Sequence, residues 1–249
     1  MKDDSVIRSD SSDRVGIVLT GTIIPNANYV AVKSSQQRRS EYLAALKFYS
    51  SFGEVWFLEN SGYNFDGDSA FLELKNVHIM KYPKSNQFDK GKGYQEFEML
   101  DSFFTSDWQV GMPERFVKVT GRYIIRNFAS IFRECQNEIR CDALVDAFQD
   151  RNVANTYLLY CTRKFYLRYM VKLFLQVNDS AGRYIEHVVF AMLKDKSPKF
   201  HMFQHNPVLD AVSGSTGVTY HTSYLRHIIN SLMRLWWTHG FKRAYLSHM

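Results

Sequence analysis

Phe116-Val117-Lys118-Val119-Thr120-Gly121-Arg122-Tyr123 is the stretch that decides the fold. It predicts a short buried strand over Phe116–Thr120, followed by a turn that glycine permits and that carries Arg122. Two earlier apolar runs also end in small and polar residues, at Thr20-Gly21-Thr22 and at Glu59-Asn60-Ser61-Gly62. Ligands of open α/β sheets bind where such strands end, so the sequence predicts a binding site at this edge.

Composition places the chain among globular proteins with one large domain. It has 249 residues, of which 45% are hydrophobic and 15% aromatic, which is ample for a packed core. It contains no run of about 18 apolar residues, the length that a membrane-spanning helix needs. Residues 1–14 are polar and charged, lack the apolar core of a signal peptide and are expected to form a flexible leader.

The net charge of +6 is concentrated near the C-terminus. No acidic residue follows Asp210, whereas Arg226, Arg234, Lys242 and Arg243 do. The remainder of the chain is close to neutral, which argues against a broad nucleic-acid-binding surface.

Three cysteines occur, an odd count that favours a reducing, cytoplasmic compartment. Cys135 and Cys141 have no histidine near them in sequence, so we expect buried thiols and predict no metal site.

Strand and helix patterns alternate along the first half of the chain. Strands are predicted at 15–19, 54–58, 77–82 and 116–120, and helices at 36–50, 93–104 and 123–135. This order predicts a mainly parallel twisted sheet flanked by helices. Residues 15–140 would form a nucleotide-binding half of a single domain spanning 15–249.

The second half is less regular, and we expect residues 141–220 to form an acceptor-binding half. Strands are predicted at 143–148, 157–161 and 199–203, and helices at 164–177 and 183–194. The glycine- and serine-rich residues 213–217 predict a flexible loop. A final helix over 221–239, within a basic amphipathic segment 221–249, suits an anionic membrane surface, a core position or a dimer interface.

The loop at Thr20, Gly21 and Thr22 could hold a diphosphate through its backbone amides, although an ordinary strand-end turn has the same pattern. Glu59 and Asn60 could bind a ribose or base, or could cap a turn.

Lys90-Gly91-Lys92-Gly93-Tyr94-Gln95-Glu96 opens the second helix, where unpaired amides and two lysines would favour a phosphate. Glu96 would point at the same site. The alternative is a basic surface loop.

Two further groups of residues are candidates. Lys118 and Thr120 share one face of their strand, and Arg122 suits bidentate contact with a phosphate, unless it pairs with a nearby acid. Glu186, beside His187 on an apolar helix, is a candidate catalytic base or half of a structural pair.

Asp66-Gly67-Asp68 matches the Asp-x-Asp pattern that holds a divalent metal with a nucleotide sugar, or a solvated turn. It lies before the third predicted strand rather than after the fourth.

Together, Thr20–Thr22, Glu59–Tyr63, Gly91–Glu96 and Lys118–Tyr123 resemble the bacterial glycosyltransferases of capsule and O-antigen synthesis. The resemblance covers 15–127, with weaker matches at 184–187 and 214–217. It implies a GT-A-like fold, a UDP-, GDP- or CMP-sugar donor, and a glycan or glycolipid acceptor. It also implies surface-polysaccharide synthesis on the inner face of the membrane.

Family members place Asp-x-Asp after the strand that here leads into Thr120, so metal dependence is in doubt. The resemblance assigns Thr20, Gly21, Thr22, Glu59 and Asn60 to the nucleotide, with further contacts from Gly93, Glu96, Lys118 and Thr120. Lys92 and Arg122 would stabilise the departing phosphate, and Glu186 would act as the base.

Other functions fit parts of the sequence. A non-catalytic module could dock on a membrane or partner through the C-terminal helix. A methyltransferase would need a glycine-rich first turn that this chain lacks.

Overall fold

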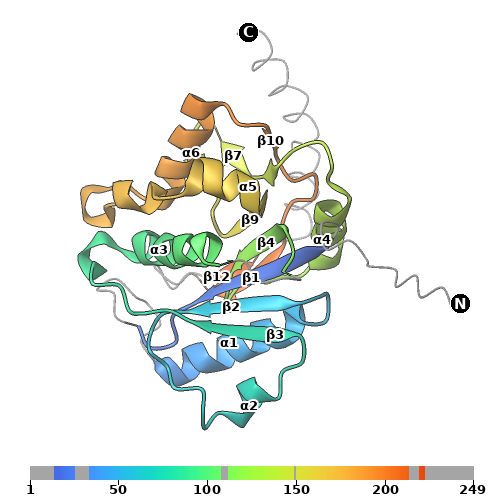
Figure 1. The fold of residues 1–249 in the computed structure, drawn as a ribbon, viewed down its shortest axis with the longest axis vertical. Helices are drawn as coiled ribbons and strands as arrows, with labels where there is room; N and C mark the ends of the chain where they lie inside the picture. The colour runs from blue at the N-terminus through green and yellow to red at the C-terminus, as the bar shows by residue number, and fades with distance from the viewer. Residues whose placement is uncertain (1–13, 26–33, 108–111, 149, 213–218, 222–249) are drawn as a thin grey trace, which may run out of the picture.

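The computed structural model describes residues 14–25, 34–107, 112–148, 150–212 and 219–221. Seven strands form the main sheet in the order β10–β6–β9–β4–β1–β2–β3 (Figure 1). Every neighbouring pair is parallel except the two that involve β9. The bounds of these strands are β1 (Val15–Gly21), β2 (Val55–Glu59), β3 (Val77–Lys81), β4 (Arg115–Thr120), β6 (Ala143–Leu144), β9 (Leu158–Thr162) and β10 (Phe200–His201).

Helices cover both faces of this sheet (Figure 1). Their bounds are α1 (Ser35–Tyr49), α2 (Ser69–Leu72), α3 (Lys92–Thr105), α4 (Phe128–Asn137), α5 (Arg163–Phe165) and α6 (Ile185–Lys196). Because side chains alternate along a strand, Ile17 and Leu19 of β1 pack with α1 and α4, while Val18 packs with α3 and α6. All three side chains are completely buried, which explains the continuous apolar run in the sequence.

The predicted fold class is therefore confirmed: the protein has a mainly parallel sheet between two layers of helices. Smaller elements complete it: β5 (Ile124–Ile125), β7 (Ala147–Phe148), β8 (Val153–Ala154), β11 (Leu209–Val212), β12 (Thr219–His221), the 3₁₀ turns η1 (Phe88–Lys90), η3 (Leu173–Gln176) and η4 (Asp179–Ala181), and the π-helical turn η2 (Tyr166–Met170).

Three predicted elements differ from the structure, two of them in the second half and one at the end of the first. The strand predicted at 143–148 is two short strands in different sheets, β6 and β7. The helix predicted at 164–177 is broken into α5, η2 and η3, and Lys172 has a positive φ of 62° at the break. The helix predicted from Tyr123 begins only at Phe128, because residues 124–125 form β5 and pair with β11.

His221 ends β12 rather than beginning a helix. The predicted loop at 213–217 and the rest of the predicted C-terminal helix lie outside the described residues. In the described part of the chain, no helix has both the length and the hydropathy to cross a bilayer.

The strand order locates a switch point between β1 and β4. From β1 the chain moves outward through β2 to β3, and then returns through α3 to place β4 on the other side of β1. Crossovers on opposite faces leave a crevice at the carboxyl ends of the two adjacent strands, where ligands of such sheets bind. Thr20 and Thr120 are paired in register at this edge.

Candidate active site at the carboxyl edge of the sheet

A buried ion pair lies at the switch point. Lys118 Nζ is 2.7 Å from Glu96 Oε1, and the Lys118 side chain is only 2% exposed. The hydroxyls of Thr20 and Thr120 donate to the same carboxylate oxygen. The carboxylate therefore joins β1, β4 and α3, and the structure brings these four predicted site residues together.

Glu186 is connected to this pair through Thr156. Lys118 Nζ donates to the carbonyl oxygen of Thr156 at 2.6 Å, and the hydroxyl of Thr156 donates to Glu186 Oε1 at 3.0 Å. Asp179 is near enough to sense Glu186: burial together with the charge of Glu186 raises the pKa of Asp179. Two carboxylates thus lie together beside the strand ends.

Glu59 organises the loop that follows β1. Its carboxylate is buried and accepts hydrogen bonds from the amides of Ile23 and Ser61, both at 3.0 Å, and from the Ser61 hydroxyl. This geometry favours a positioning role for Glu59 over the predicted contact with ribose. Asn60 is also buried, and its Oδ1 accepts from the Thr22 hydroxyl at 2.7 Å.

Three cations from different elements converge next to this loop. Arg38 of α1 donates to the carbonyl oxygen of Thr22 at 2.7 Å, and Arg122, just beyond β4, pairs with Glu41 at 2.6 Å. Burial, together with the charges of Arg38 and Arg122, lowers the pKa of Lys92 to about 8. Arg122 similarly contributes to the lowered pKa of Arg38, whose main cause is burial.

The N-terminus of α3 already has a carboxylate partner. The amide of Lys92, where the sequence predicts a phosphate, donates to Asp179 Oδ2 at 3.1 Å. Gly91 makes this approach available, because it has a φ of 99° and a Cβ there would lie 1.8 Å from the same oxygen. Gly93 permits close packing of α3 on Ile185 of α6. Asp179 therefore occupies the amide at which the sequence predicts a phosphate.

Gly21, at the end of β1, and Gly121, just after β4, allow close packing that a larger residue would prevent. A Cβ on Gly21 would lie 2.4 Å from the ring of Phe57, and one on Gly121 would lie 2.4 Å from the carbonyl oxygen of Thr20. Gly121 thus lets the chain leave β4 directly against the end of β1.

Asp66 and Asp68 do not fit a metal site. The Asp68 carboxylate makes a bidentate ion pair with Arg39, which holds the pKa of Asp68 below its usual range, and it also accepts from the Tyr63 hydroxyl. Asp66 lies 3.5 Å from Lys81 at an exposed position. The solvated-turn alternative describes Asp66, and a structural ion pair describes Asp68.

Sequence reasoning missed three residues of this site: Arg38, Thr156 and Asp179. Arg38 lies on an amphipathic helix among other charged residues, Thr156 lies in an irregular segment, and Asp179 begins the short turn η4. Of the three, only Arg38 could have been predicted from the sequence, because a basic residue on the helix after β1 lies near the end of that strand in this fold.

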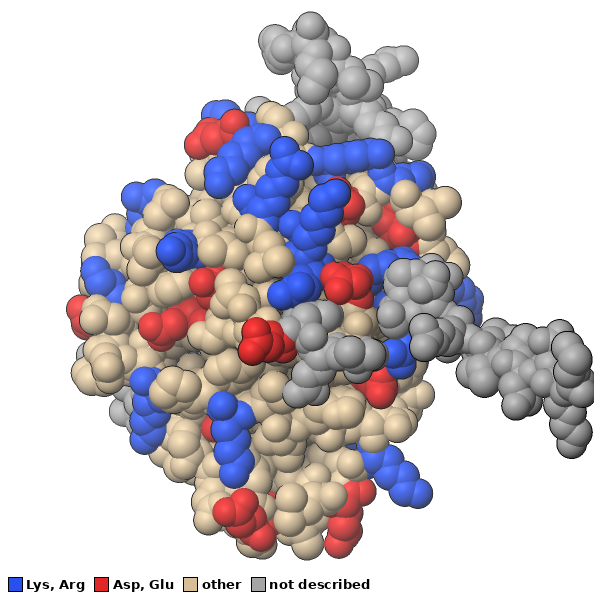
Figure 2. Space-filling view, in the orientation of Figure 1, with Lys and Arg blue, Asp and Glu red and all other residues tan. Residues whose placement is uncertain are grey.

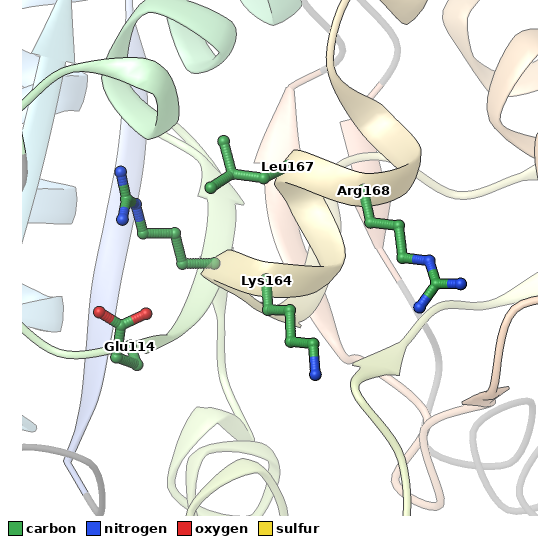
Figure 3. A pocket seen from close by; sticks show the side chains of 5 residues that line it. Glu114, Lys164, Leu167 and Arg168 are labelled. Carbon is green, nitrogen blue, oxygen red and sulfur yellow. The ribbon is translucent and has the colours of Figure 1, made fainter.

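Two cavities lie at the opposite, amino edge of the sheet. One, of about 390 Å³, is lined by Glu114, Arg163, Lys164, Leu167 and Arg168 (Figure 3). It is part of a face on which Lys and Arg side chains gather over α5 (Figure 2). The other, of about 240 Å³, lies between the end of α4 and the segment after β10. Neither cavity is lined by a predicted site residue.

A scan of protein-family models found no match to this chain, and a search of curated protein sequences found none either. Several solved structures are similar to it. One is described as a nucleotide-diphospho-sugar transferase from Desulfovibrio desulfuricans G20, at 9% identity and a TM-score of 0.47, covering 77% of this chain and 80% of that one.

Two others are similar at the same level. A cytidylyltransferase from Leptospira borgpetersenii has 18% identity and a TM-score of 0.42 over 76% of this chain and 75% of that one. A glycosyltransferase from Streptococcus pneumoniae TIGR4 has 9% identity and a TM-score of 0.45 over 77% of this chain but only 46% of that one. At these values the likeness assigns neither an activity nor a substrate to this chain.

Proposed function

We propose that the protein is a glycosyltransferase that moves a sugar from a nucleotide-sugar donor to a saccharide or glycolipid hydroxyl. The observation that carries this proposal is the convergence of Arg38, Lys92 and Arg122 at the carboxyl edge of β1 and β4. Like charges in a partly buried place repel one another, and an anion bound between them would offset that cost. A diphosphate carries the negative charge that would do so.

The surrounding groups suit the rest of a nucleotide sugar. The loop held by Glu59 and Asn60 would lie against the nucleotide, with Thr22 at its exposed side. Glu96, which is 20% exposed, would contact the donor sugar, and Lys118, Thr20 and Thr120 would hold that carboxylate in place. In this assignment the buried Lys118 is a support, and the partly exposed Glu96 makes the contact.

In the reaction, the acceptor oxygen forms a bond to the anomeric carbon while the bond from that carbon to the diphosphate breaks. The proton of the acceptor hydroxyl passes to Glu186, which Thr156 orients. Lys92 and Arg122 offset the negative charge that develops on the leaving diphosphate, an electrostatic role that metals fill in other enzymes. These steps describe inversion at the anomeric centre; if configuration is retained, Glu186 orients the substrate.

The biological setting stays a prediction. Capsule or O-antigen synthesis, contact with the inner face of the membrane and dimer formation all depend on the resemblance or on residues 222–249, outside the described part of the chain.

Binding of nucleotides tests the proposal directly. A thermal-shift screen of UDP, GDP, CMP and their sugars, with and without EDTA, should show one base giving a rise in the unfolding midpoint. Lys92→Met should abolish most of that rise, whereas Lys75→Met, which removes an exposed lysine before β3, should keep it.

Two outcomes would contradict the proposal. Binding of no nucleotide at all would favour a non-catalytic docking module. Release of pyrophosphate from a nucleoside triphosphate and a sugar phosphate would show a nucleotidyltransferase instead.

A further inference from the structure

Glu138, Cys141 and His201 lie together at the amino edge of the sheet. Glu138 directly follows α4, Cys141 lies in the connection to β6, and His201 is in β10. The parallel pairing of β10 with β6 brings His201 to this place, with His201 opposite Leu144. One oxygen, one sulfur and one ring nitrogen from the three side chains all lie within 4.8 Å of one another.

We propose that these three side chains bind a zinc ion. Thiolate, imidazole and carboxylate are the ligands that Zn²⁺ takes in proteins, and a mixed set with a thiolate disfavours Mg²⁺ and Ca²⁺. The two anionic ligands together balance the charge of a divalent ion. Ligand atoms about 2.0–2.3 Å from a tetrahedral zinc ion are roughly 3.3–3.8 Å apart, so modest side-chain rotations would close this set on an ion.

The groups around the set are placed as supports for metal ligands. The Glu138 side chain is 1% exposed, and it accepts hydrogen bonds from the amide of Arg140 at 2.6 Å and from its guanidinium at 2.9 Å. The hydrogen bonds to Glu138 fix the orientation of this carboxylate as a ligand. The Cys141 thiol donates to the carbonyl oxygen of Ala143 at 3.0 Å, a bond that it gives up when the deprotonated sulfur binds the ion.

An ion and its fourth ligand, a water molecule, have a path to the set. Glu138 and Arg140 line the cavity of about 240 Å³ at the end of α4. The Arg140 side chain is 56% exposed, so its movement opens the way to the carboxylate.

The zinc ion would hold this edge of the sheet together, with water at its fourth coordination position. The two strands that it connects, β6 and β10, contain only two residues each, and β10 is the edge strand of the sheet. Short edge strands are held weakly by their own hydrogen bonds, so a metal that joins residues about 60 positions apart would fix the edge. The catalytic candidates lie at the other ends of the strands, so the proposal stands apart from the proposed function.

Cobalt binding tests the site. After treatment with a chelator, the full-length protein should bind one equivalent of Co²⁺ and develop a thiolate-to-cobalt charge-transfer band, which Zn²⁺ then removes. Zn²⁺ at 100 times its dissociation constant should raise the unfolding midpoint by about 5–10 °C. Cys141→Ser and His201→Asn should each lose the band and most of the rise.

Cys161→Ala is the matched control, because Cys161 is a buried thiol of β9 that lies opposite Ala143 of β6 but outside the set. It should keep both the band and the rise. If Cys141→Ser fails to fold, His201→Asn carries the test. Absence of a charge-transfer band in the folded wild-type protein, or its survival in His201→Asn, would overturn the proposal and leave a plain cluster of polar side chains.

Discussion

Arg115 and Arg122 flank the same strand, β4, but they serve different purposes. At the amino edge, Arg115 donates to the carbonyl oxygens of Cys135, Gln136 and Glu138 at 2.7, 2.9 and 3.1 Å. These carbonyls lie at the C-terminal end of α4, where the helix dipole favours a cation. The charge of Arg115 therefore stabilises the end of this helix.

At the carboxyl edge, the charge of Arg122 helps to lower the pKa of Arg38, and the charges of Arg38 and Arg122 help to lower the pKa of Lys92. Glu41 pairs with Arg122, yet the charge of Arg122 still contributes to the lowered pKa of Arg38 and of Lys92. The comparison teaches that the role of an arginine depends on the groups that surround its side chain. A guanidinium on helix carbonyls is structural, whereas converging cations indicate an anionic ligand.

The largest expected effect separates the chemistry of the two edges. Glu186→Gln should lower the turnover number for sugar transfer by about 10²–10⁴-fold, because the acceptor hydroxyl loses its base, while nucleotide affinity stays unchanged. Glu114→Gln, at the amino edge, should leave both quantities unchanged. Full turnover in Glu186→Gln would remove the base assignment.

The buried pair beneath the site should dominate stability at the carboxyl edge. Lys118→Met should lower the free energy of unfolding by about 3–5 kcal/mol, because Glu96 loses its buried cation. Urea unfolding would measure it, and the double variant Lys118→Met with Glu96→Gln should recover part of the loss. A loss below about 1 kcal/mol would mean that water replaces the lysine.

Arg115→Met should show the structural character of the amino edge. Hydrogen bonds to a charged group contribute about 1.5–3 kcal/mol, so stability should fall by at least that amount in urea unfolding. Nucleotide affinity should be unchanged. Arg38→Met, in contrast, should weaken nucleotide binding. Equal nucleotide affinities of Arg115→Met and Arg38→Met would contradict the different roles assigned to the two edges.

The smallest expected effect is a pH dependence. The pKa of Lys92 is lowered from 10.5 to about 8 in the folded protein, so the unfolded chain holds this proton to higher pH. Raising the pH from about 8 toward 10.5 therefore removes the free-energy cost of holding a charged Lys92 in the folded protein. Through this group, the unliganded protein becomes more stable. Below pH 8 the cost is fully present.

Nucleotide affinity should change in the opposite direction. A bound diphosphate favours the charged lysine, so affinity should fall by up to about tenfold per pH unit above pH 8. Calorimetry across pH 7–10 would measure the fall, and Lys92→Met should flatten it. An unchanged slope in that variant would show that another group titrates.

The sequence by itself determined the first four strands of the sheet and the edge where the candidate site lies. Apolar runs that end in Thr20, Glu59 and Thr120 could be recognised because parallel strands present their carboxyl ends together. The spacing of apolar residues and the residue types that form turns are local properties of the sequence. The strands and helices of residues 15–120 were therefore predicted well, apart from the short α2. The π-helical and 3₁₀ turns after α5 were not, because tertiary packing overrides an apolar pattern.

Only the tertiary structure decided which polar groups support the fold and which remain for a ligand. Asp179 reaches the start of α3 across 87 positions of sequence, and Arg39 takes the carboxylate of Asp68. His201 joins Glu138 and Cys141 in the same way. The partner that a charge finds depends on burial and on distant segments, and neither is encoded in the residues beside it.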